Sequence, residues 1–86
     1  MITLNPQVAW VDRGETIWLL DLGAADPRPI ALTGSGATLW RLLPCASASE
    51  LARRVGLDFE VTEEAVAGDV DEFVESLVRQ GLLQVA

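Results

Sequence analysis

The alternation of apolar and polar residues divides the chain into an extended first part and a helical second part, with the change near Thr33. Short runs of bulky apolar residues predict strands at 8–11, 16–20 and 29–32. The run 16–20 is apolar on both faces, which favours a central strand covered on each side. Short connections between the three runs indicate an antiparallel meander.

After Thr33 the apolar residues recur at helical spacing and predict helices at 35–43, 47–56 and 62–81. Ser47 and Glu50 form the S-x-x-E pattern of a capping box, and Gly56 stands where a C′ glycine belongs. Thr62 is expected to cap the third helix and Gly81 to end it.

The apolar tail at 82–85 is expected to pack back on the core. The predicted fold class is therefore α+β, a winged-helix-like plan with a three-stranded antiparallel sheet followed by three helices. A chain of 86 residues is enough for one small domain, which we expect to span residues 1–86.

Charge narrows the classes of partner. The chain has 13 acidic and 6 basic residues, a formal net charge of −7, and no lysine. Such a surface repels phosphate backbones and anionic lipids, so neither nucleic acid nor a membrane is an expected partner. A winged-helix DNA-binding protein is the alternative to weigh, but the helix at 62–81 holds six acids and one arginine. No signal peptide or membrane span is visible, and a cytoplasmic location is expected.

Few residues are available for chemistry. There is no histidine, and Cys45 is the single cysteine, which excludes the Ser-His-Asp and Cys-His arrangements and any internal disulfide. No catalytic residue, metal site or cofactor is predicted. The glycines in "TGSG" at 33–36 invite comparison with a phosphate loop, but the lysine and the further glycines of such loops are missing. A tight strand-to-helix joint, capped by Thr33 or Ser35, is the preferred interpretation.

Three tryptophans, Trp10, Trp18 and Trp40, are expected to lie mostly in the core, with one partly exposed. The acids of the long helix are expected to form a solvated face. Asp69 is the exception, because helical spacing places it at the rim of the apolar stripe beside Phe73.

The third predicted strand contains the most informative residues. Pro29 cannot donate a ladder hydrogen bond, which favours an edge position for this strand. In an antiparallel strand the backbone groups of alternate residues point to the same side. We therefore expect Ile30 and Leu32 to face the neighbouring strand and Pro29 and Ala31 to face an open edge. Such an edge invites either self-association or a partner strand.

The long helix has an apolar arc wider than one contact with a small sheet requires, so part of it is expected to border a groove beside this edge. An extended peptide suits a groove with strand hydrogen-bonding groups on one wall and an apolar helix on the other. The expected binding residues are Pro29, Ile30, Ala31, Leu32, Asp69, Val70, Phe73 and Leu77.

Two segments resemble the PqqD-like domains, also called RiPP recognition elements. "ALTGSGATLW" is similar to the family pattern L-N-x-[ST]-G-A-x-[IL]-W, with Thr33 in place of the usual asparagine. "DVDEFVESLVRQGLL" is similar to the closing pattern D-V-x-x-F-[LV]-x-x-L-x-x-x-G-L-L. The order and length of the elements also agree, so the resemblance extends over nearly the whole chain. The loop at 21–28 is the main departure from the family.

The resemblance implies a binding function without catalysis. Domains of this family bind the leader of a ribosomally made precursor peptide, which adds as a strand to the third strand against the third helix. They then deliver it to a leader peptidase or another modifying enzyme. A free-standing domain of this length looks like the leader-binding protein of lasso-peptide pathways. A PqqD-type peptide chaperone for a radical-SAM enzyme stays open, as does a subunit that merely stabilises a partner enzyme.

Overall fold

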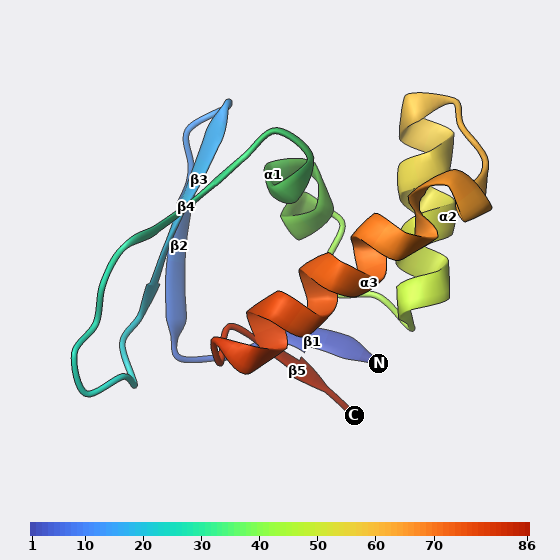
Figure 1. The fold of residues 1–86 in the computed structure, drawn as a ribbon. Coiled ribbons are helices and arrows are strands. Elements are labelled where there is room, and N and C mark those ends of the chain that lie inside the picture. The colour runs from blue at the N-terminus through green and yellow to red at the C-terminus, as the bar shows by residue number, and fades with distance from the viewer.

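A computed structural model describes all residues from Met1 to Ala86. Its elements follow the order β1 (Ile2–Leu4), β2 (Val8–Asp12), β3 (Thr16–Asp21), β4 (Ile30–Thr33), α1 (Gly34–Arg41), α2 (Ala48–Phe59), α3 (Glu63–Arg79) and β5 (Leu83–Val85). Figure 1 shows the strands β2, β3 and β4 at one end of the molecule and α2 at the other. The helix α1 lies between them, and α3 crosses the middle.

The larger sheet has the predicted meander topology. It has the order β2-β3-β4 with both neighbouring pairs antiparallel, so the three-stranded sheet followed by three helices is confirmed. The third strand is an edge strand, as Pro29 indicated, but it covers Ile30–Thr33 and begins one residue later than expected. A proline directly before an edge strand disturbs no ladder.

One expectation for the central strand β3 is wrong. Ile17 and Leu19 are buried beneath the helices, whereas Trp18, on the opposite face, is 45% exposed. The sheet is therefore covered on one face only. The apolar residues of its other face, which we call the outer face, are left at the surface.

The sequence also missed a second sheet. The three-residue strands β1 and β5 pair antiparallel, with Ile2 opposite Val85 and Leu4 opposite Leu83. The tail does pack on the core, since Leu82 and Leu83 are buried, but it does so as part of a strand pair. Because the C-terminal tail forms β5 and pairs with β1, it does not cover the free edge of β4.

Two of the three helices begin with the side-chain N-cap that the sequence predicted. The hydroxyl of Ser47 accepts from the Glu50 N–H at 3.1 Å, and that of Thr62 accepts from the Ala65 N–H at 3.2 Å. Gly81, with φ +77°, follows the end of α3 as expected.

The expected end of α2 is wrong. The helix continues past Gly56 to Phe59 and closes with Glu60 in the left-handed region at φ 55°. Gly56 instead permits the backbone at Val61 to approach α2 closely, because an added Cβ would lie 2.8 Å from the Val61 carbonyl oxygen.

None of the helices combines the length and apolar character needed to cross a membrane.

The core is one cluster of 15 buried apolar residues that joins both sheets to all three helices. Trp40 of α1 lies at its centre, 1% exposed, and packs edge-to-face on Trp10 with ring centroids 6.0 Å apart. Trp10 itself is 46% exposed. Of the three tryptophans only Trp40 is a core residue, so the expectation that most would be buried is wrong.

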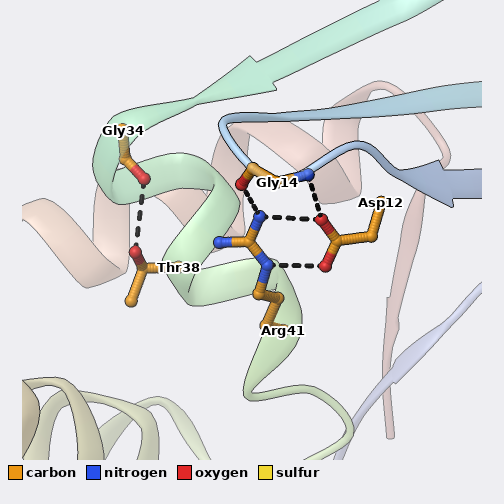
Figure 2. A network of polar contacts seen from close by, with 5 residues as sticks. All are labelled: Asp12, Gly14, Gly34, Thr38 and Arg41. Atoms are coloured by element: carbon orange, nitrogen blue, oxygen red, sulfur yellow. Dashed lines mark hydrogen bonds and ion pairs between the residues drawn. The ribbon is translucent and has the colours of Figure 1, made fainter.

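A polar clamp joins the β2–β3 hairpin to the end of α1 (Figure 2). The Arg41 guanidinium donates from Nε to Asp12 Oδ2 at 2.7 Å and from Nη2 to Asp12 Oδ1 at 2.9 Å. It also donates to the Gly14 carbonyl, while the Gly14 N–H donates to Asp12 at 2.9 Å. The hydrogen bond from Arg41, followed by the one from Gly14, lowers the pKa of Asp12 to about 2.

The clamp gives stability a specific pH dependence. Because the pKa of Asp12 is about 2 in the folded chain and about 3.9 when unfolded, its contribution is present above pH ~4 and is lost as the pH falls toward 2. Arg41→Met should therefore lower the free energy of unfolding at pH 6, and this deficit should shrink between pH ~4 and ~2. Urea denaturation of both proteins across this range measures it. Arg28→Met is the control, since its pair with Asp26 is more than three-quarters exposed; a deficit for Arg41→Met that does not change with pH would contradict the prediction.

Candidate functional site

The free edge of the larger sheet is fixed by its hydrogen-bond register. At the hairpin, the Arg13 N–H donates to the Thr16 carbonyl at 2.9 Å, so the backbone groups of Thr16 point toward β2. Because these directions alternate along a strand, Ile17 and Leu19 point their backbone groups toward β4.

The residues opposite Ile17 and Leu19 are Leu32 and Ile30, whose backbone groups therefore face β3. Those of Ala31 face away from the sheet, where no strand pairs with β4. Pro29, just before the strand, has a carbonyl on the same open side but no N–H. By the same alternation the N–H of Thr33 faces the open side, so the edge presents a donor and acceptor pair at Ala31, an acceptor at Pro29 and a donor at Thr33.

A groove of about 560 Å³ lies beside β4. It is bordered by Ile30 and Leu32 of β4, Ser35 of α1, and Asp69, Glu72, Phe73, Ser76, Leu77, Arg79 and Gln80 of α3 and its end. The α3 residues fall at intervals of three and four along much of that helix, so one helical face forms the wall opposite the strand.

The groove has an apolar floor. Ile30, Leu32 and Phe73 are partly buried and pack on the core, and Leu77 is a core residue that is 4% exposed. The floor rests on the core, while Ile30, Leu32 and Phe73 keep part of their apolar surface exposed. Such a floor can receive apolar side chains without first rearranging.

The two ends of the groove differ in charge. Asp69 lies in the first half of α3 and lines the groove together with Ser35 of α1, Glu72 lies about one turn further along the helix, and Arg79 lies at the last turn of α3. All three side chains are exposed, and none makes an ion pair within the chain.

A smaller hollow of about 220 Å³ continues the groove between α1, α2 and α3. It shares Ser35, Asp69 and Phe73 with the groove, and its remaining lining is Gly36, Leu39, Val55, Phe59 and Val66. The Phe73 ring therefore borders both spaces.

The groove contains five of the eight residues expected from the sequence: Ile30, Leu32, Asp69, Phe73 and Leu77. Ala31 contributes its backbone at the edge, while its exposed side chain lies on the outer face. Val70 is not in the groove. It is 1% exposed and belongs to the core, because it lies on the side of α3 that packs inward.

Pro29 lines a different hollow, one of about 260 Å³ on the outer face. That hollow is otherwise bordered by Ala9, Trp10, Val11, Trp18, Leu19 and Leu20. Sequence reasoning missed five polar residues of the groove: Ser35, Glu72, Ser76, Arg79 and Gln80. The signal was available in part, because Glu72, Ser76 and Gln80 follow Asp69 and Phe73 at helical intervals.

The other chemical candidates are structural. Gly34 makes the turn into α1 with φ +56°, as a strand-to-helix joint requires, and Thr33 holds the N-cap position without a side-chain cap. Cys45 is 4% exposed, and burial raises the pKa of its thiol, which keeps it protonated and unreactive. No group of three or more acids and cysteine lies close enough to hold a metal ion.

Two comparisons with known proteins found a match. The family model described as coenzyme PQQ synthesis protein D (PqqD) matches residues 15–83. The solved structure of TbiB1 in complex with the TbiA(beta) leader peptide has the same fold, with a TM-score of 0.83 over 98% of this chain and 96% of that chain, at 20% sequence identity. Among curated proteins, none matches the sequence at a significant level.

Proposed function

Because the chain belongs to the family of coenzyme PQQ synthesis protein D, we propose that it is a non-catalytic protein that binds the leader of a ribosomally made precursor peptide. The leader pairs with the free edge of β4 and places apolar side chains in the groove against α3. The protein then presents the bound precursor to a leader peptidase or another modifying enzyme, as in lasso-peptide pathways. The solved structure with the same fold holds a leader peptide, which supports this proposal.

The observation that carries the proposal is the combination of an open strand edge with an adjacent apolar floor. Ala31 offers its N–H and carbonyl to an incoming strand, and Ile30, Leu32 and Phe73 lie directly beside it. An edge alone would pair with any extended chain. The floor adds a preference for apolar residues at alternate positions, since successive strand side chains point to opposite faces.

The expected affinity follows from these two contributions. About three backbone hydrogen bonds contribute about 1 kcal/mol each. Burial of about 400 Å² of apolar surface contributes on the order of 10 kcal/mol before costs. Ordering a flexible leader and losing rigid-body freedom remove several kcal/mol. The free energy of binding should then be roughly −10 to −8 kcal/mol, which corresponds to a dissociation constant between tens of nanomolar and micromolar.

Isothermal titration calorimetry tests the proposal. The titrant is the leader of a precursor peptide encoded beside the protein's own gene, and a scrambled leader of the same composition is the control. Binding of the native leader alone, with a negative heat-capacity change, is the expected result. Tight binding to a modifying enzyme without any affinity for the free leader would contradict the proposal and favour a purely stabilising subunit.

Asp69 provides a graded test within the groove. The carboxylate is exposed at the groove wall and can accept a hydrogen bond from a donor of the leader. Asp69→Asn should weaken leader binding about two- to five-fold, the range for one exposed charged contact, and leave the thermal midpoint unchanged. Asp71→Asn is the matched control, because Asp71 is exposed on the same helix outside the groove. Equal losses for the two variants would argue against a specific contact.

A further inference from the structure

The charges along the groove indicate the order in which basic and acidic residues follow one another along a bound leader. Ser35 and Asp69 are shared with the smaller hollow, which places them at the α1 end of the groove. Ile30 and Gln80 are shared with a further hollow at the opposite end. The strand β4 runs from Ile30 at that opposite end to Thr33 at the α1 end.

The orientation of a paired strand follows from this axis. Both strand pairs of the larger sheet are antiparallel, and an antiparallel addition to β4 continues the pattern. A leader added in this way begins near Asp69 and ends near Arg79. It thus runs in the same direction along the groove as α3 does.

The electrostatic difference between the two ends has a definite sign. Toward the α1 end the groove holds Asp69 and, one turn further along α3, Glu72, and no basic side chain. At the opposite end Arg79 lies beside the further hollow, whose charged residues are Asp21, Asp26 and Arg28. The formal charges of these four residues add up to zero at the opposite end, whereas the formal charge at the α1 end is −2. A cation is therefore favoured where the leader enters, and an acid is favoured only next to Arg79.

The distance between the charged sites sets the spacing. Ten positions separate Asp69 from Arg79 on α3, which corresponds to about 15 Å along the helix axis. A strand covers about 3.3 Å per residue, so four strand residues span about 13 Å. Residues at positions i, i+2 and i+4 share one face of a strand. In a bound leader, the side chain at position i+2 then lies over the apolar floor at Leu32 and Phe73.

We infer that the groove selects leader segments in which a basic residue lies two positions before, and an acidic residue two positions after, an apolar anchor. This inference rests on the proposed function and adds a charge order to it. The side chains at the intervening positions point away from α3 toward the outer face and are not selected by the groove.

Peptide display tests the charge order with peptides of random sequence, so the native leader is not required. Random dodecapeptides are selected on the immobilised protein, and an enriched sequence is synthesised together with a version in which its basic and acidic residues are exchanged. The basic-first peptide should bind about three- to ten-fold tighter at low ionic strength, the range for two exposed ion pairs. The difference should shrink at ~1 M salt, where screening reaches about 3 Å.

Protein variants supply the matched control. Glu72→Arg combined with Arg79→Glu should invert the preference between the two peptides. Glu75→Arg should keep it, because Glu75 is an exposed α3 residue outside the groove. Enriched peptides without a charge order, with acids first, or with a preference unaffected by the double variant would overturn the inference while leaving peptide binding in place. A selection that enriches no peptide, or only peptides indifferent to Phe73→Ala, would contradict the proposed function itself.

Discussion

Replacing Phe73 by alanine is expected to weaken leader binding at least ten-fold while the domain stays folded. The ring borders both the groove and the smaller hollow, so its loss removes the apolar surface on which leader anchors rest. Since Phe73 is only partly buried, its truncation should cost less than the roughly 3–5 kcal/mol of a fully buried phenylalanine. Calorimetric titration with the leader measures the affinity, and circular dichroism measures the fold.

Two further variants separate binding from folding. Phe73→Leu keeps most of the side-chain volume and should restore much of the affinity. Val78→Ala truncates an exposed apolar residue of the same helix outside the groove and should change neither property. The assignment of Phe73 to the site fails if the folded alanine variant binds the leader like the original protein. It also fails if both Phe73 variants unfold, because the ring would then be a core residue.

Ala31→Pro is expected to reduce leader affinity by about ten-fold or more through the backbone alone. The substitution removes the N–H that faces the open edge, a loss of about 1 kcal/mol, and puts a ring where the leader carbonyl would approach. Because this N–H has no partner strand within the domain, the fold should tolerate the change, as edge strands generally do. The same titration, with thermal unfolding alongside, gives both quantities.

Ala31→Val serves as the control for this position. It keeps the N–H and enlarges only a side chain that points to the outer face. Valine also favours strand geometry. A folded proline variant with unchanged affinity would mean that the leader contacts the helix without joining the sheet.

The sequence was most informative where local chemistry decides the structure. Thr62 and Gly81 bracket α3 because a hydroxyl cap and a positive-φ glycine act within one helical turn. Pro29 likewise marked β4 as an edge strand, since a missing N–H restricts where a strand can lie. A groove beside β4 was expected from these two elements, and five of the eight residues expected there line it.

The remaining features depend on contacts between distant parts of the chain. The strand β1 has three residues, and its partner β5 lies about eighty positions away, so no local pattern marks it. Val70 and Phe73 both belong to the apolar arc of α3, and only the placement of α2 and the sheet decides which one is core and which borders the groove. Glu72 was expected on a solvated face with the other acids of α3, and Arg79 was not expected at the site, because their position beside β4 is a tertiary property.

The distribution of the tryptophans has a practical consequence for spectroscopy. None of the three lines the groove: Trp40 is buried in the core, the Trp10 ring packs on Trp40 at the covered face of the sheet, and Trp18 lies on the outer face. Intrinsic indole emission should therefore stay nearly constant when a non-fluorescent peptide fills the groove. A protein that covers the outer face would instead shift the emission of Trp18 toward the blue, so the two kinds of complex can be told apart in a single cuvette.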